Sequence, residues 1–190
     1  MPRHWPLTDS VVEGDFRIFR LRRDRAVSPR TGAPHDFYVL ETRDWINIIP
    51  VTDSGDVVMV RQYRHGVREV TLEIPGGILD HAGEDPQEAA ARELLEETGY
   101  RPRQIVPLGA LQAQPAMQDN LLHTYLALGC ERVREPDPDA GEDLRVVTFP
   151  LREVRSRIAA GEIRHSLVVA AFYRFEAWRG FREDDLGGER

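Results

Sequence analysis

A helix-forming segment at residues 86–98 carries three glutamates on one side, and this acidic face constrains the chain most. Glu93, Glu96 and Glu97 stand at positions i, i+3 and i+4, so an α-helix would place them on one face, with neighbours about 5–6 Å apart. Like charges at this spacing repel, and Arg92 relieves part of the repulsion because it can reach Glu96 at i+4. The pattern is compatible with a solvated acidic face or with a cage for Mg²⁺ or Mn²⁺, which prefer oxygen ligands.

The residues at both ends of this segment predict where the helix begins and ends. Asp85 is a favourable N-cap, Pro86 fits the first helical position, and Glu88 completes an Asp-x-x-Glu capping box. Gly99 suits the left-handed position that follows a helix. The sequence therefore predicts a helix over 86–98 that carries its glutamates in its last two turns.

Strand-like runs surround this helix and favour a mixed α/β fold. Strands are expected at 45–52, 57–63, 71–74, 105–111, 122–128 and 144–149, and helices at 151–160 and 166–178. Two further alternating runs, 16–22 and 37–40, flank a turn cluster and predict a small antiparallel sheet. We expect an N-terminal β extension over 1–44, an α/β domain over 45–182 and a frayed polar tail over 183–190.

Composition excludes several kinds of chemistry. The chain has 190 residues and a net charge of −7, and all of its 25 basic residues are arginine. Without lysine there is no P-loop lysine and no Schiff base, and the acidic balance argues against a nucleic-acid partner. Cys130 is the only cysteine, which excludes an intrachain disulfide and a thiolate zinc cluster. No apolar run approaches the ~20 residues of a membrane span, so we expect no membrane partner and a cytoplasmic location.

The loop before the helix extends the acidic motif into a longer pattern. It reads Gly77-x6-Glu84-x7-Arg92-Glu93-Leu94-x-Glu96-Glu97-x-Gly99-Tyr100. This pattern resembles the Nudix box, which is glycine, five residues, glutamate, seven residues and then Arg-Glu-apolar-x-Glu-Glu-x-Gly-apolar. Everything from Glu84 onward matches, and the one departure is an extra residue between Gly77 and Glu84. A surface loop tolerates such an insertion. The resemblance extends over roughly residues 45–178.

Similarity to the Nudix family implies an α/β/α sandwich with a mixed sheet and the hydrolysis of a nucleoside diphosphate linked to another group. By this resemblance Glu93 and Glu97 are catalytic and are the chief metal ligands. Glu96 assists directly or through water, the carbonyl of Gly76 is a further ligand, and Arg92 orients a glutamate. The implied cofactor is Mg²⁺, with Mn²⁺ as a substitute.

Segments on both sides of the box resemble the branch of ADP-ribose and nucleotide-sugar pyrophosphatases. Before the box stand Arg61-Gln62-Tyr63-Arg64 and Leu72-Glu73-Ile74-Pro75-Gly76-Gly77, and after it comes Pro115. The resemblance implies that Arg64 contacts the substrate diphosphate, since a planar guanidinium bonds two phosphate oxygens. A surface arginine at a strand end is the alternative. Arg61, Glu73 and Pro115 are grouped with Arg64 as substrate-binding residues. The segment after Pro115 lacks the familiar Pro-Gly-x-Ser form, which leaves GDP-mannose and other nucleoside diphosphate sugars open.

Aromatic residues and the N-terminal strands complete the substrate side of this prediction. Trp45, Phe37 and Tyr38 are candidates to stack on a nucleobase, and packing in the core or at a dimer interface is the alternative. Members of this branch exchange their N-terminal strands between subunits, so the resemblance implies a homodimer formed through residues 1–44.

The general base is expected in the acidic loop before the last strand, as in related pyrophosphatases. Glu142 is the first candidate, followed by Asp143 and Asp139, and a box carboxylate such as Glu93 is the alternative.

These observations predict a metal-dependent hydrolase of ADP-ribose or a related nucleoside diphosphate sugar, giving a nucleoside monophosphate and a sugar phosphate. One alternative is a Nudix hydrolase of dinucleotides, oxidised nucleotides or capped RNA. Another is a Nudix domain that senses ADP-ribose without cleaving it. The presence of all three box glutamates favours catalysis over sensing.

Overall fold

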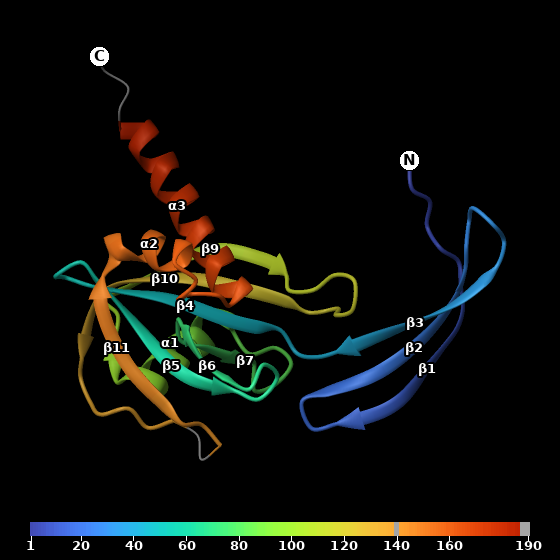
Figure 1. Cartoon of the computed structure of the whole chain (residues 1–190), viewed down its shortest axis with the longest axis horizontal. Helices are drawn as coiled ribbons and strands as arrows, with labels where there is room; N and C mark the ends of the chain where they lie inside the picture. The colour runs from blue at the N-terminus through green and yellow to red at the C-terminus, as the bar shows by residue number, and fades with distance from the viewer. Residues whose placement is uncertain (139–140, 187–190) are drawn as a thin grey trace. The chain divides into compact units, whose positions relative to one another are not determined.

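The computed structural model describes residues 1–138 and 141–186, with the backbone alone for 181–186 (Figure 1). Its internal contacts divide the chain into two units. The first comprises Met1–Asp44 and Leu111–Leu122, and the second comprises Trp45–Ala110 and His123–Arg190. Within the described residues, no helix combines the length and the apolar character needed to cross a membrane.

The first unit contains an antiparallel sheet in the order β1-β2-β3. Its strands are β1 (Leu7–Phe16), β2 (Phe19–Val27) and β3 (Pro34–Glu41). The expected antiparallel extension is confirmed, but the prediction of one strand over 16–22 is wrong because a hairpin turn lies at Arg17 and Ile18. No glycine or proline marks this turn. The rings of Phe16 and Phe19 lie 4.9 Å apart across it, a contact that the sequence pattern alone does not reveal.

The segment Leu111–Leu122 joins this unit through backbone contacts. The amide of Leu40 donates to the carbonyl of Met117 at 2.7 Å, and the amide of Leu121 donates to the carboxylate of Asp44 at 2.9 Å. These bonds anchor the connection that contains Pro115 to the end of β3.

The second unit is built on a mixed sheet of eight strands among the described residues. Its central order is β11-β5-β4-β10-β8, with β6 beside β5, β7 beside β4 and β9 beside β10. The strands are β4 (Trp45–Thr52), β5 (Asp56–Arg64), β6 (Glu69–Glu73), β7 (Gly76–Ile78), β8 (Tyr100–Arg101), β9 (Gln104–Gln112), β10 (Leu121–Arg132) and β11 (Leu144–Pro150). The expected strands are present. The short β7 and β8 were not predicted, because two or three residues carry no readable periodicity.

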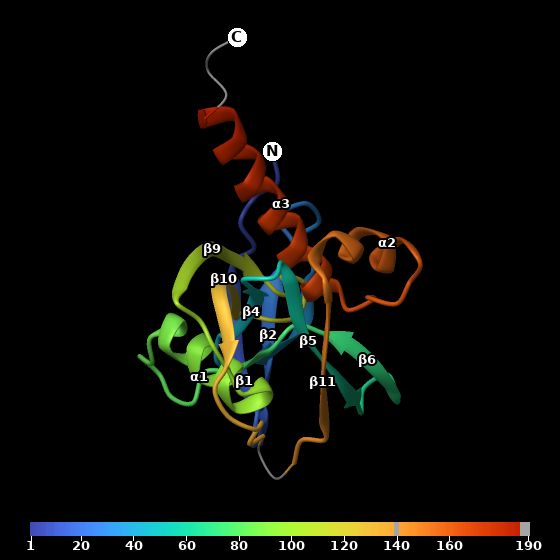
Figure 2. The ribbon, with the colours of Figure 1, turned by 90° about the vertical axis from the view of Figure 1, so that its left-hand side faces the viewer.

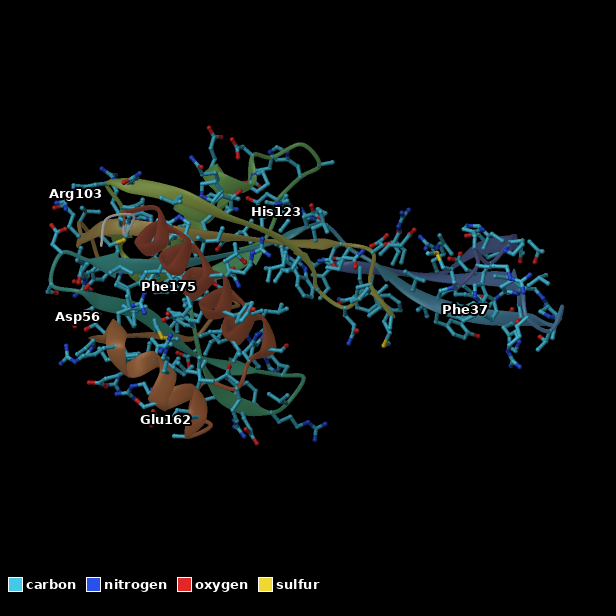
Figure 3. The ribbon with its side chains drawn as sticks, turned by 90° about the horizontal axis from the view of Figure 1, so that it is seen from above. Phe37, Asp56, Arg103, His123, Glu162 and Phe175 are labelled. Carbon is cyan, nitrogen blue, oxygen red and sulfur yellow. The ribbon has the colours of Figure 1, made fainter. Side chains whose placement is uncertain are left out.

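Helices cover both faces of this sheet, which confirms the predicted sandwich (Figure 2). They are α1 (Pro86–Thr98), the 3₁₀ turn η1 (Leu151–Glu153), α2 (Val154–Ala159) and α3 (Ser166–Leu186). Ile46 and Ile48 of β4 pack in one buried cluster with Leu94 of α1. Ile49 packs in another with Phe175 of α3, which Figure 3 labels. Even-numbered residues of β4 therefore face α1, and odd-numbered residues face α3.

The last helix extends further toward the C-terminus than the sequence pattern predicts. Helix α3 was expected over 166–178 but continues to Leu186, so residues 183–186 belong to it. Residues 187–190 of the expected tail lie outside the described part of the chain.

The predicted ends of α1 are confirmed. The carboxylate of Asp85 accepts a hydrogen bond from the amide of Gln87 at 2.8 Å, and Pro86 occupies the first turn. Gly99 ends the helix at φ 74° and donates its amide to the carbonyl of Leu95 at 2.9 Å. A capping box also requires the Glu88 carboxylate to accept a hydrogen bond from the backbone amide of Asp85. This part of the prediction is wrong, because Glu88 makes no side-chain hydrogen bond within the described chain.

Gly99 also receives the chain that returns from β10. Its carbonyl accepts hydrogen bonds from the amides of Val133 at 2.9 Å and Arg134 at 3.3 Å. A Cβ at this position would overlap the carbonyl oxygen of Arg134. Both the left-handed backbone and this close approach therefore require glycine.

Gly99→Ala should destabilise the protein more than Gly161→Ala. Gly161 has almost the same backbone, φ 75°, but no atom lies within 4 Å of the position of its Cβ. We expect the control to cost about 1 kcal/mol for the backbone alone, and Gly99→Ala to cost about 1–3 kcal/mol more because the carbonyl must move. Urea unfolding of both variants measures the difference. Equal losses would show that the contact with Arg134 contributes nothing.

Candidate active site

Two of the predicted metal ligands, Glu97 and Glu93, lie under the glycine pair of β7. Glu97 is 2% exposed, the amide of Gly76 donates to its carboxylate, and its Oε2 is buried without a hydrogen-bond partner among the described residues. The backbone of Gly77 approaches the carboxylate of Glu93 so closely that a Cβ would overlap it. The two glycines thus let the backbone cover two acidic side chains.

Burial and mutual repulsion raise the pKa values of both carboxyl groups. Burial is the main cause of the high pKa of Glu97, and the charges of Glu93 and Glu142 raise it further. Burial raises the pKa of Glu93 to about 7, and the charge of Arg92 only partly offsets this effect. The charges of Glu96 and Glu142 add to the rise for Glu93. Two carboxylates that repel each other at low dielectric constant favour a cation between them.

Glu142, the first candidate for the general base, belongs to the same acidic cluster. It lies in the loop before β11, is half-buried and is close enough to Glu93 and Glu97 to raise the pKa of each. Asp143, the second candidate, is exposed, and Asp139 lies outside the described residues. The structure therefore brings Glu142 to the paired glutamates from a distant part of the chain.

Arg64 lies near Glu97 and Glu142 and is held by Glu73. Its Nε and Nη2 donate to the two carboxylate oxygens of Glu73 at 2.9 and 2.7 Å, and the hydroxyl of Thr71 donates to Glu73 at 2.6 Å. The Glu73 hydrogen bonds are the main cause of a raised pKa for Arg64, to which the charges of Glu97 and Glu142 contribute. The side chain of Arg64 is 43% exposed, whereas that of Glu73 is 4% exposed. Glu73 therefore lies behind Arg64 and fixes its guanidinium.

The Arg64–Glu73 pair stays ionised despite its burial. Burial opposes the charge of Glu73, but the hydrogen bonds and charge of Arg64 together outweigh it and hold the pKa of Glu73 below its usual value. A two-point ion pair of this kind orients a planar guanidinium firmly. The nitrogen of Arg64 that Glu73 does not engage remains available for an anion.

Other predicted substrate-binding residues lie on the opposite face of the sheet. Arg61 and Arg64 are three residues apart on β5, so their side chains lie on opposite faces of the strand. The cross-strand neighbour of Arg61, Leu72, packs in the cluster on the α3 side. Trp45 shares its face of β4 with Asn47, whose Nδ2 donates to the carbonyl of Leu167 in α3 at 3.4 Å. The structure therefore does not place Arg61 or Trp45 with the glutamates, which lie on the α1 side.

Three further candidates belong to the first unit. Pro115 is an exposed residue between β9 and β10. Phe37, which Figure 3 labels, and Tyr38 are exposed on β3. The ring of Phe37 contacts that of Trp5 edge to face, with the ring centroids 5.3 Å apart. Their predicted contacts with a nucleotide stay predictions.

The carboxylate of Glu96 is bonded to Arg92, which links it to Glu93. Arg92 Nη1 donates to Glu96 Oε2 at 3.0 Å and to Glu93 Oε1 at 3.1 Å, which confirms the expected i, i+4 contact. Among the described residues, no three His, Cys, Asp or Glu side chains are arranged to hold a metal ion. The oxygen donors of Glu93 and Glu97, with the unpartnered Oε2, nonetheless fit a hard divalent cation. A third ligand from the helix would require Arg92 to release Glu96.

Sequence reasoning missed two residues that organise this site. Thr71 braces Glu73, and its position two residues earlier on the same face of β6 could have indicated this. The carboxylate of Asp80 lies 3.2 Å from Arg92 Nη2. An acidic residue in a loop one residue longer than the box pattern could have indicated this contact.

The raised pKa values predict an unusual pH dependence for the metal-free protein. Between the ordinary value of 4.5 and about 7, folded Glu93 retains a proton that the unfolded chain loses, so stability should fall as the pH rises through this window. Glu93→Gln should remove on the order of 2 kcal/mol of this dependence. Chemical denaturation at several pH values, with a chelator present, measures it. Identical pH dependence in the wild type and the variant would contradict the raised pKa.

Comparison with known proteins agrees with this geometry. The family model of the NUDIX domain matches residues 42–172. The chain is 36% identical over 154 residues to the ADP-ribose pyrophosphatase of Mycobacterium tuberculosis (strain ATCC 25618 / H37Rv), covering 80% of this chain and 74% of that protein. It is 30% identical over 165 residues to the methanol dehydrogenase activator of Bacillus methanolicus, covering 86% and 87% respectively.

A solved structure shares the whole fold. The crystal structure of an ADP compounds hydrolase superimposes with a TM-score of 0.84 over 96% of this chain and 97% of that one, at 21% identity. Since the domain match covers the glycine pair, the acidic helix and Arg64 together, this chain belongs to the Nudix family and is a pyrophosphatase hydrolase of that family.

Proposed function

We propose that the protein hydrolyses the diphosphate bond of ADP-ribose or a related nucleoside diphosphate sugar, giving a nucleoside monophosphate and a sugar phosphate. The observation that supports the proposal best is the fixed guanidinium of Arg64 near the buried carboxylate of Glu97, which is itself paired with Glu93. An arrangement of positive and negative groups this close suits a diphosphate that binds together with a cation. The name of the M. tuberculosis relative supports ADP-ribose as the substrate.

Nudix enzymes typically use a divalent metal, and we propose Mg²⁺ here, with Mn²⁺ as a substitute. Glu93 and Glu97 would hold the ion, and Glu96 and the carbonyl of Gly76 would complete its protein ligands. When bound, a divalent ion neutralises phosphate charge and lowers the pKa of water. The buried, unpartnered Oε2 of Glu97 supports this assignment.

The remaining steps fall to side chains of the site. Arg64 binds the diphosphate with the part of its guanidinium that Glu73 leaves open, while Arg92 orients Glu93. Glu142 accepts a proton from the water that attacks one phosphorus, and the bond from that phosphorus to the bridging oxygen breaks. Glu93 is the alternative base.

We also propose that residues 1–44 form a dimerisation extension and residues 45–182 the hydrolase domain. Side chains that are apolar and at least 40% exposed occur throughout the first unit: Met1, Trp5, Leu7, Val11, Val12, Phe16, Ile18, Phe37, Tyr38 and Met117. Extended apolar surface favours association with a second copy. In such a dimer Phe37 or Tyr38 would be available to stack on a nucleobase.

Glu97→Gln should lower kcat by about 10²–10⁴-fold while the fold is retained, because the amide keeps the shape but is a poor ligand for a hard cation. Glu88→Gln is the matched control, since it removes the same charge from an exposed position on the same helix. Steady-state assays with Mg²⁺ and circular dichroism measure both effects. An unchanged kcat for Glu97→Gln would remove Glu97 from the metal site.

A substrate panel tests the proposed specificity. We expect turnover of ADP-ribose or another nucleoside diphosphate sugar, with nucleoside monophosphate as a product. Cleavage of dinucleotides, oxidised triphosphates or capped RNA, with the sugars untouched, would contradict the substrate class. Tight ADP-ribose binding without turnover in Mg²⁺ would instead support a sensing domain.

A further inference from the structure

Arg92 lies between two groups of carboxylates that pull it in opposite directions. On the helix side, Nη1 donates to Glu93 and Glu96 at 3.1 and 3.0 Å. On the loop side, Nη2 lies 3.2 Å from Asp80 Oδ2 and 3.4 Å from Glu84 Oε1. The Nε of Arg92 is buried without a partner among the described residues. The position of the guanidinium is thus set by the balance between its two ends.

The loop before α1, which is one residue longer than in the box pattern, supplies the second group of carboxylates, Asp80 and Glu84. The amide of Asp80 donates to Glu84 Oε2 at 2.6 Å, which closes the segment Asp80–Glu84 into a compact turn. This turn holds the carboxylates of Asp80 and Glu84 on the same nitrogen of Arg92. The extra residue relative to the box pattern falls within this loop, which is where Asp80 acquires its contact.

The balance affects any cation that binds Glu93. Nη1 of Arg92 occupies Glu93 Oε1, so a divalent ion at this oxygen must compete with it. A guanidinium held strongly by the loop gives up Glu93 and Glu96 more easily than one that depends on them alone. The Asp80 contact is one of four ion pairs of Arg92 among the described residues, so its loss shifts the guanidinium toward the helix.

We infer that Asp80 is a positioning residue that sets the cation affinity of the site by drawing Arg92 away from Glu93 and Glu96. This inference rests on the proposed metal site. It assigns a role to a residue that belongs to neither the acidic helix face nor the substrate clamp, and it explains how Glu96 becomes available as a third ligand.

A double-mutant cycle read by Mn²⁺ binding tests the inference. Mn²⁺ dissociation constants, measured by calorimetry and by electron paramagnetic resonance without substrate, are compared for the wild type, Asp80→Asn, Arg92→Gln and the double variant. We expect Asp80→Asn to weaken binding about threefold and to have no such effect once Arg92 is replaced. Asp80→Glu keeps a carboxylate at this position and should bind Mn²⁺ with the wild-type affinity. Glu88→Gln controls for the loss of one negative charge, and circular dichroism verifies that each variant folds.

The outcomes separate this inference from the proposed function. An equal loss of affinity from Asp80→Asn in both backgrounds would assign the effect to overall charge and overturn the inference. Unchanged affinity in Asp80→Asn would also overturn it and leave the metal site intact. If Glu97→Gln binds Mn²⁺ as tightly as the wild type, the proposed metal site is wrong and the role of Asp80 falls with it.

Discussion

The second unit depends on the burial of two like-charged carboxyl groups beneath a strand of glycine backbone. Glu97 is almost fully buried and Glu93 is half-buried, and their high pKa values reflect the cost of that burial. The Gly76 amide lowers that cost for Glu97, and Arg92 lowers it for Glu93. The repulsion that remains between Glu93 and Glu97 favours a bound cation, and this is the reason for proposing a divalent metal ion at this site.

We propose different roles for the two arginines near the carboxylates, because their partners differ. Arg64 is fixed by the buried carboxylate of Glu73, which binds it at two points and leaves part of the guanidinium exposed. Arg92 is shared among several carboxylates at longer distances, so its position responds to changes in any of them. An arginine held in one orientation suits substrate recognition, whereas an arginine shared among several carboxylates suits adjustment of the metal ligands.

Much of this site could be predicted from the sequence, because many of its residues lie close together in the chain. The helix, its Asp85 cap, its Gly99 end and the contact between Arg92 and Glu96 all follow from spacing within 15 residues. The meeting of Glu142 with Glu97 depended on a family resemblance. The face on which Arg61 lies and the position of the hairpin turn at Arg17 and Ile18 both depend on pairing between whole strands. Such non-local contacts leave no periodic signal in the sequence.

The most direct test of the account is a crystal structure of the protein grown with Mn²⁺ and recorded at a wavelength where manganese scatters anomalously. We expect an anomalous peak within bonding distance of Glu97 Oε2 and of the Glu93 carboxylate, beside the Gly76–Gly77 backbone. Anomalous density elsewhere on the molecule, with these two carboxylates still bonded only to protein atoms, would contradict it.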